Sequence, residues 1–558
     1  MFGKRIRHIK RYRDVAKVLT HHGFGFFVEE MGLLHMLSLP KRLFTDTEKM
    51  DPMTVGARIR RVIEELGPTY VKIGQIASTR ADIIPEEILK ELEKLQDDVP
   101  SFSFDQVTRI IEEKLGSPLN EVFSWIDEEA IAAASIGQVH RAQLRTGELV
   151  AVKVQRPGIK AIIETDLEIL LDLATLAERR MERMERLQLR DVVEEFAKSL
   201  RNELDYSIEA RNAEKIAKQF KKDPTIHIPA IYWDYSTRTV LTMEFVQGLK
   251  LTQFEEIEKM GYDRKAIAEH LVQSVFQQVL IEGFFHADPH PGNIFLLSEG
   301  VISLIDFGMV GRLTADMKQN LASMVIAMMR QNTESMLKAV LRIGIVPDEV
   351  NLPLLTSDVD ELRELYVDVP MSRISLGEAI SNLFKVAFRH RIRIPADFTL
   401  LAKCFLTLEG IVEKLDPQLS MMDMAEPFGI RLLKERYRPS TIADRVWHNL
   451  TDYSDLLVDL PKQLKDLMGN LVKGRIRLEV SVPELDIFLK KLDRITNQIS
   501  FSIVLLAFSI VMAGVVIASA LGNQPILLWH IPAIEVGFSM ATLMLLWLFI
   551  SIFKSGKF

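Results

Sequence analysis

Three short segments that follow one another in a fixed order restrict the fold of this chain more than any other feature. The apolar run VAVK ends at Lys153, and the segment HADPHPGN carries Asp288 and Asn293 five positions apart. The segment VISLIDFG then places Asp306 directly after an apolar run. A kinase active site presents a lysine, a catalytic aspartate, an asparagine and a metal-binding aspartate in this order. Each segment alone is weak evidence, but together they predict a bilobal protein-kinase-like fold of the α+β class.

These residues have different expected roles. We expect the ammonium group of Lys153 to bind the phosphates of ATP or ADP at the end of a strand. Asn293 and Asp306 are the predicted Mg²⁺ ligands, because magnesium prefers hard oxygen ligands. Asp288 is the predicted catalytic residue, which orients or deprotonates an attacking water or hydroxyl group. His286 is expected to organise this loop and not to act as a base.

The glycine-rich loop of a protein kinase is missing before Lys153. In its place stands AAASIGQV, whose side chains restrict the backbone where glycine would allow a close approach to phosphate. We therefore expect a nucleotide preference or rate unlike that of a protein kinase. No A-P-E motif or long activation segment follows Asp306, so no peptide-substrate platform is evident. The predicted ATP-binding residues, besides Lys153, are those of the loop and of an adenine-binding hinge: Ala132, Ala133, Ala134, Ser135, Ile136, Gly137, Gln138, Val139, Glu244 and Val246.

The C-terminal end contains two long apolar runs. Residues 499–521 contain no charged residue, and residues 532–553 contain only Glu535. Each run is long enough to cross a hydrocarbon core of about 30 Å as a helix. Lysine and arginine residues flank the pair and are missing from the loop between the runs, so the positive-inside rule places both ends in the cytoplasm. We predict a transmembrane hairpin; a buried pair of apolar core helices is the less favoured alternative.

The rest of the chain divides by its local patterns. A basic N-terminal segment suits either contact with anionic lipid or an ordinary helix docked on the core. A strand pair is expected within residues 226–246. The predicted units are a membrane-proximal segment at 1–50, a helical extension at 51–125, a smaller kinase-like lobe at 126–247, a larger lobe at 248–440, an amphipathic linker at 441–498 and the membrane hairpin at 499–553.

Composition excludes some classes of function. The formal net charge of −7 provides no general field for nucleic acid, so no nucleic-acid partner is expected. Cys404 is the only cysteine, which rules out an intramolecular disulfide bond and a thiolate metal cluster.

The motif K-x-G-Q, formed by Lys72 to Gln75, completes a set that resembles the UbiB family of atypical kinase-like proteins. The likeness runs from about residue 55 to residue 340 and extends to the C-terminal membrane hairpin of bacterial members. It implies that the N-terminal helical extension folds across the active site. It also implies binding of ATP or ADP with Mg²⁺, ATPase activity in preference to protein phosphorylation, and support of ubiquinone or related isoprenoid quinone biosynthesis.

The two apolar runs and the resemblance together lead to an expected location and expected partners. The expected location is the cell inner membrane, with two membrane helices and the catalytic domain on the cytoplasmic side. The expected partners are membrane lipid and isoprenoid quinone intermediates or the enzymes that make them.

The resemblance extends to acidic residues in the segment RNELDYSIEA. Glu203 and Asp205 occupy the family's ExD motif, and on one continuous helix Asp205 and Glu209 share a face. We favour Glu209 as the partner of Lys153, and Glu203 with Asp205 as partners of the extension. A solvated charged face is the alternative for each of these acids.

Three functions remain compatible with the sequence. The first is a membrane-anchored regulatory ATPase. The second is a genuine kinase that acts on a lipid or small molecule, and the third is a nucleotide-binding scaffold without turnover. The joint presence of Asp288, Asn293 and Asp306 argues against the scaffold.

Overall fold

The structure, a computed structural model, describes residues 2–31, 53–80, 84–95, 99–180, 189–347, 350–366, 369 and 374–436, with scattered residues between 502 and 539. Within these ranges, no helix has the length and apolar character that crossing a membrane requires. The predicted linker at 441–498 lies outside the described residues, and so does the predicted membrane hairpin apart from the scattered positions.

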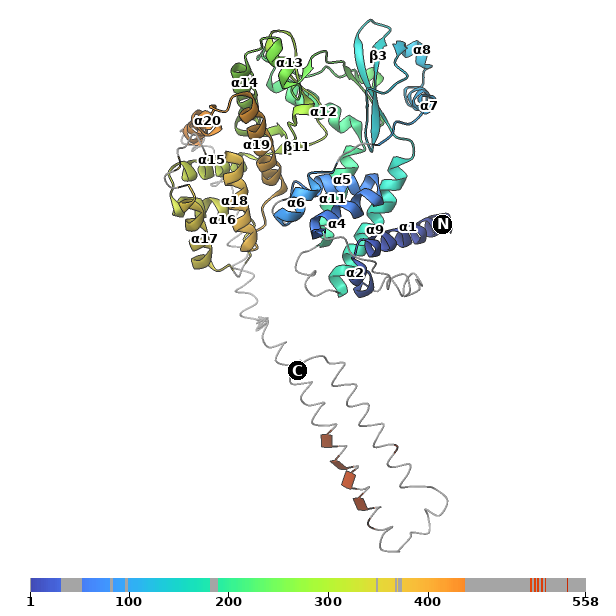
Figure 1. Ribbon diagram of the computed structural model, residues 1–558, viewed down its shortest axis with the longest axis vertical. Helices are drawn as coiled ribbons and strands as arrows, with labels where there is room; N and C mark the ends of the chain where they lie inside the picture. Colours follow the sequence, from blue (N-terminus) through green and yellow to red (C-terminus); the bar gives the residue numbers. More distant parts are fainter. Residues whose placement is uncertain are drawn as a thin grey trace, which may run out of the picture. The chain divides into compact units, whose positions relative to one another are not determined.

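An antiparallel sheet forms the smaller part of the kinase-like region (Figure 1). Its strands run in the order β1-β3-β4-β6, and β2 pairs with β3. Val150, Val152 and Val154 of β4 are fully buried, so the alternation of a strand leaves Lys153 on the opposite face. The turn between β3 and β4 contains Gly147 at a φ of 105°, a backbone region that favours glycine. Strands β3 and β4 therefore form an antiparallel β-hairpin. The strands are β1 (Phe123–Ile126), β2 (Ala132–Ala133), β3 (Gly137–Leu144), β4 (Leu149–Gln155) and β6 (Val240–Glu244).

Helix α7 (Phe104–Leu115), followed by the short α8 (Leu119–Val122), covers the buried valine face of this sheet. Val107 and Ile111 of α7 are completely buried there. Because α7 occupies one face, the face that carries Lys153 remains for helix α12 (Tyr206–Gln219) and for a ligand.

Further helices belong to the N-terminal region and to the segment after β4. Apolar residues of α1 pack against α4 and α9, with Val15 and Ala16 buried. Arg11 donates from Nε to Asp166 Oδ1 at 2.7 Å and from Nη2 to the Leu66 carbonyl at 2.7 Å. Of the two alternatives for this segment, the structure shows docking on the core. The helices are α1 (Phe2–His21), α2 (Gly25–Glu30), α4 (Val55–Leu66), α5 (Pro68–Ala77), α6 (Glu86–Leu92), α9 (Ile159–Arg180) and α11 (Leu189–Glu203).

Short strands in the larger part of the region hold the two motif-bearing loops. One sheet has the order β5-β10-β9-β7, and β8 pairs with β11 separately. The predicted strand pair within 226–246 is confirmed in part: Ile231 and Met243 form an antiparallel bridge, but the strands themselves take other partners, because β5 pairs in parallel with β10 and β6 joins the first sheet. The strands are β5 (Ile226–His227), β7 (Leu249–Lys250), β8 (Phe284–His286), β9 (Ile294–Leu296), β10 (Ile302–Leu304) and β11 (Val310–Arg312).

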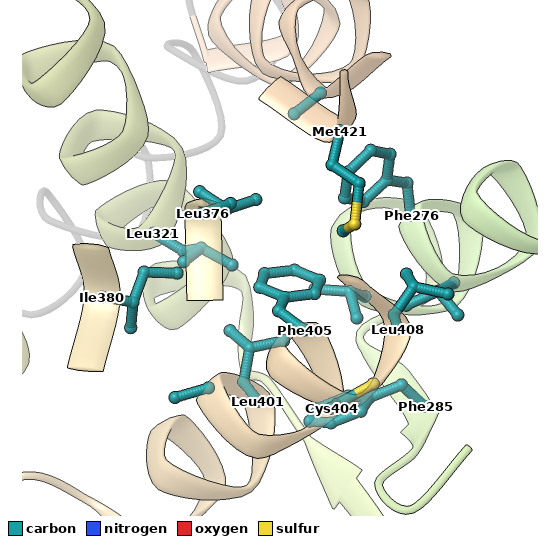
Figure 2. Packing of buried hydrophobic residues seen from close by; sticks show 14 of the residues in the cluster. Phe276, Phe285, Leu321, Leu376, Ile380, Leu401, Cys404, Phe405, Leu408 and Met421 are labelled. Carbon is teal, nitrogen blue, oxygen red and sulfur yellow. The ribbon is translucent and has the colours of Figure 1, made fainter. Parts of the chain in front are cut away.

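A helical core packs against these strands. Figure 2 shows Phe276, Phe405 and Leu408 meeting in this core, with the rings of Phe276 and Phe405 edge to face at 5.8 Å between centroids. Burial of such large side chains is the main stabilising contribution here. The helices are α13 (Phe254–Lys259), α14 (Arg264–Phe276), a π-helical turn (Gln277–Glu282), α15 (Ala315–Met329), α16 (Thr333–Ile343), α17 (Leu352–Glu364), α18 (Leu376–Arg389), α19 (Ala396–Leu415) and α20 (Met421–Arg436).

Candidate functional site

Lys153 and Glu209 form a largely buried ion pair. Lys153 Nζ lies 2.8 Å from Glu209 Oε2 and 3.0 Å from Oε1, which joins strand β4 to helix α12. Burial alone would lower the pKa of Lys153, but the carboxylates of Glu209 and Asp306 raise it above its ordinary value. Burial raises the pKa of Glu209, and Lys153 opposes that rise. The favoured pairing of Lys153 with Glu209 is present in the structure.

Asp306 follows strand β10 with an unusual backbone conformation. Its φ is 61°, a left-handed value that costs energy for a residue other than glycine. Its Oδ1 atom accepts a hydrogen bond from the Gly308 amide at 3.2 Å. Burial alone would raise the pKa of Asp306, but the ammonium groups of Lys153 and Lys72 lower it. Asp306 is therefore ionised at neutral pH, as a metal ligand must be.

The K-x-G-Q segment lies on α5 and contributes one residue to the same place. Lys72 Nζ lies 2.7 Å from Glu203 Oε1 at the end of α11. Gln75 does not line the cavity described below; its side-chain amide donates to the Leu95 carbonyl at 3.3 Å. The extension thus brings Lys72 to the site, while Gln75 ties α5 to the segment after α6.

One cavity collects these charged groups. Lys72, Lys153, Glu203, Glu209 and Asp306 all line it, and they come from α5, β4, α11, α12 and the segment after β10. The alanine-rich loop forms part of its wall through Ala132, Ala133, Ala134, Ile136, Gly137 and Val139.

Two residues of that loop face elsewhere. Ser135 and Gln138 are buried and do not line the cavity. The side chain of Gln138 accepts from the Phe102 amide at 2.9 Å and donates to the Phe102 carbonyl at 3.2 Å. Gln138 therefore clamps the loop to the segment before α7, and its side chain does not take the predicted nucleotide-contacting place.

Gly137 allows the loop to approach α12 closely. A β-carbon at this position would lie 2.3 Å from the Tyr206 hydroxyl and 2.5 Å from the Val154 carbonyl. We predict that Gly137→Ala destabilises the protein by about 1–3 kcal/mol, the usual cost of an overpacked site. Urea unfolding measures this change. Gly410→Ala is the control, because a β-carbon at that position would meet nothing within 4 Å. If both variants were equally stable, the prediction would be contradicted.

The predicted catalytic loop, residues 286–293, is held next to Asp306 by His286. The Asp288 amide donates to His286 Nδ1 at 3.1 Å, while His286 Nε2 lies 3.1 Å from the Ile305 carbonyl. Burial lowers the pKa of His286, so the ring is neutral and donates from Nε2. Its expected organising role is confirmed. The Asn293 carbonyl accepts from the Ile305 amide at 2.9 Å, which brings this predicted metal ligand close to the residue before Asp306.

Asp288 and Asn293 do not line the cavity, and neither do the two residues of the predicted adenine hinge, Glu244 and Val246. Glu244 pairs with His227 at 3.1 Å and accepts from the Ala230 amide at 3.1 Å, so its side chain is engaged with the segment after β5. The proposed adenine contact concerned backbone groups of this hinge, and that contact stays a prediction.

Asp205 requires a correction. The continuous helix assumed for residues 203–209 is broken, because α11 ends at Glu203 and α12 begins at Tyr206. Asp205 is the N-cap of α12 and accepts from the Ser207 amide at 3.1 Å. Among the described residues it does not pair with the extension as favoured; its carboxylate lies 3.5 Å from Arg238 Nε instead. The structure places only Glu203 of this motif against the extension.

The lining residues fit a magnesium-bound polyphosphate. Lys72 and Lys153 are suited to phosphate oxygens, and the ionised Asp306 is suited to Mg²⁺. Among the described residues, no three His, Cys, Asp or Glu side chains gather as a metal-binding group. Mg²⁺ commonly takes only one or two protein ligands together with phosphates and water, so Asp306 would be sufficient as a first ligand. Asn293, the second predicted ligand, does not line the cavity.

The sequence did not predict that Lys403 lies beside the loop of residues 286–293. Lys403 Nζ of α19 lies 3.7 Å from Asp288 Oδ1. No local pattern indicates this contact, because Lys403 belongs to an ordinary amphipathic helix far along the chain.

Comparison with known families and proteins agrees with this geometry. Residues 94–340 match the ABC1 atypical kinase-like domain, residues 359–420 the UbiB helical domain, and residues 483–554 the ABC1/UbiB kinase-like C-terminal domain. A probable protein kinase UbiB of Pseudomonas fluorescens is 38% identical over 78% of this chain and 81% of its own length. An uncharacterized protein of Synechocystis is 34% identical over 82% of this chain and 78% of its own length.

A further relative extends the likeness to nearly the whole chain. It is an uncharacterized protein from the hydrogenase 1 5' region of Clostridium pasteurianum, 30% identical over 98% of this chain and 99% of its own length. The mixed α/β structure with a helical N-terminal region is the architecture expected from the sequence. The chain belongs to the ABC1/UbiB family of atypical kinase-like proteins.

Proposed function

We propose that this protein binds Mg–ATP or Mg–ADP in the cavity between β4 and Asp306 and slowly hydrolyses ATP. One observation carries the proposal: Lys153, Glu209 and Asp306 come from separate segments and converge on one cavity. Buried charges are costly unless they are paired or have a function. Pairing with Glu209 explains why the charge of Lys153 can be buried. Asp306, by contrast, also has a strained left-handed backbone, a feature that is common at ligand-binding sites.

The proposed reaction is the hydrolysis of the terminal phosphate. Asp288 accepts a proton from water. At the same time the water oxygen forms a bond to the γ-phosphorus. The bond from that phosphorus to the bridging oxygen breaks, and the products are ADP and inorganic phosphate. Bound Mg²⁺ would supply charge neutralisation on the phosphates. Lys153 binds phosphate oxygens, and Asp306 and Asn293 would hold the metal.

Slow turnover is expected from the walls of the cavity. The methyl groups of Ala132, Ala133 and Ala134 line it where a glycine-rich loop would leave room. The pair between Lys72 and Glu203 places the helical extension directly at the same cavity. No segment suited to peptide substrates is evident in the sequence, which favours water over a protein hydroxyl as the acceptor.

We place this activity in isoprenoid quinone biosynthesis, at the cytoplasmic face of the cell inner membrane. The support is family membership, including relatives named as probable protein kinase UbiB, and the two apolar C-terminal runs. Polyprenyl intermediates partition into the bilayer, so a tethered domain meets them at a high effective concentration. Membrane lipid and quinone intermediates, or the enzymes that handle them, are the proposed partners, with a regulatory role for nucleotide turnover.

Two measurements on the purified full-length protein test the proposal. Calorimetry with Mg–ADP should detect binding to the wild type and little or none to Lys153→Met. Radiolabelled γ-phosphate should appear as free phosphate when ATP is added with lipid or detergent. Transfer of the label to a lipid fraction would support a lipid kinase instead. Absence of nucleotide binding to the wild type would refute the proposal.

A further inference from the structure

The catalytic loop contains the predicted base Asp288 but neither lysine nor arginine. Its sequence is HADPHPGN, and Ala287 stands where protein kinases have the arginine of H-R-D. The structure supplies a cation from another part of the chain, since Lys403 Nζ lies 3.7 Å from Asp288 Oδ1. Both side chains are about one-third exposed, at 29% for Lys403 and 32% for Asp288, so they remain accessible to a substrate.

Helix α19 holds Lys403 in a set position relative to this loop. Cys404 Sγ lies at hydrogen-bonding distance, 3.4 Å, from the His286 carbonyl at the end of β8. At the start of the helix, Asp397 Oδ1 accepts from the Arg312 amide of β11 at 2.8 Å. Figure 2 shows Cys404 next to Phe285 within the apolar core. Because these contacts fix α19 at residues 397 and 404, the backbone of Lys403 stays next to the loop, and its ammonium group remains within reach of Asp288.

We propose that Lys403 is a positioning residue for phosphoryl transfer. Its ammonium group holds the Asp288 carboxylate toward the nucleophile and balances the negative charge of that carboxylate when the terminal phosphate arrives. Opposite charges at this separation attract each other, weakly while water reaches both groups and more strongly once a bound substrate displaces that water. A carboxylate without such a cation repels a triphosphate. The inference rests on the proposed function and adds a residue from the UbiB helical domain to its site.

Variants of Lys403 separate charge from packing. Lys403→Met retains an unbranched side chain, and we expect kcat for ATP hydrolysis to fall about 10- to 100-fold, as when the supports of reactive ligands are removed. The Kd for Mg–ADP should stay unchanged, because ADP lacks the terminal phosphate. Lys403→Arg restores the charge and should recover most of the activity. Lys414→Met, an exposed site on the same helix, is the control and should hydrolyse ATP at the wild-type rate.

A double-mutant cycle with Asp288→Asn tests whether Lys403 acts through Asp288. If it does, Lys403→Met causes no further loss of kcat in the Asp288→Asn background. The inference would be overturned if the losses of kcat in the double variant were additive. It would also be overturned if Lys403→Met and Lys403→Arg lost equal activity, or if Lys403→Met kept the wild-type kcat. Those results would leave the proposed function standing if the wild type still binds Mg–ADP and releases phosphate. A wild type that does neither would overturn both.

Discussion

Replacement of Asp306 by asparagine is expected to lower the rate of ATP hydrolysis about 100- to 1,000-fold, the size of effect seen when a preorganised charge-stabilising group is removed. The neutral amide is a poorer Mg²⁺ ligand and no longer offsets the charges of Lys153 and Lys72. Asparagine tolerates the left-handed backbone at φ 61°, so the variant should fold normally. Phosphate release measures the rate, and thermal unfolding checks the fold.

The same variant tests the biological role. A deletion strain carrying Asp306→Asn should fail to restore quinone production, as followed by an isotope-traced quinone profile. Asp316→Asn is the matched control, because this exposed carboxylate lies in the first turn of α15 and outside the cavity. Normal quinone production by Asp306→Asn, despite lost hydrolysis, would separate the cellular role from turnover and favour a scaffold.

Loss of the Glu209 charge should have the largest effect on stability. Glu209→Gln leaves the ammonium group of Lys153 without its closest counter-charge, and we expect the free energy of unfolding to fall by about 2–4 kcal/mol. The estimate is below the range for a fully buried pair, because the Lys153 side chain is 24% exposed and Asp306 also attracts it. Urea unfolding of the full-length protein measures the change.

Two further variants make this stability test specific. The double variant Lys153→Met with Glu209→Met removes both charges and should recover much of the lost stability. Glu164→Gln breaks an ion pair with Arg201 that is 34% and 45% exposed, so it should change stability by less than about 1 kcal/mol. A Glu209→Gln variant as stable as Glu164→Gln would show that the Lys153 pair contributes little to the fold.

Local sequence patterns were sufficient for the parts of the site that lie within one element. Lys153 is predicted at the end of a strand, and it lies near the end of β4, on the face opposite the buried valines. The apolar run before Asp306 predicts a strand, which β10 confirms. The predicted pairing of Lys153 with Glu209 is present. The segment RNELDYSIEA supported this prediction more than the assumed helix geometry did. The continuous helix behind that geometry was wrong.

The errors arose where distant segments meet or where a helix is interrupted. Asp205 is a good N-cap residue, but the surrounding residues are compatible with an uninterrupted helix, so the break carried little signal. Strand β5 contains only two residues and pairs with β10, a partner that local alternation cannot identify. The contact between Lys403 and Asp288 depends on tertiary packing of α19.

The ion pair between Lys72 and Glu203 has a practical consequence for expression fragments. A truncation cut to the matched kinase-like region, residues 94–340, deletes Lys72 and strips Glu203 of its counter-charge. The same cut removes α19, including the Phe405 ring that packs against Phe276. Activity assays on such a trimmed fragment therefore report on a different electrostatic environment. A faithful fragment must start before Lys72 and continue beyond α19.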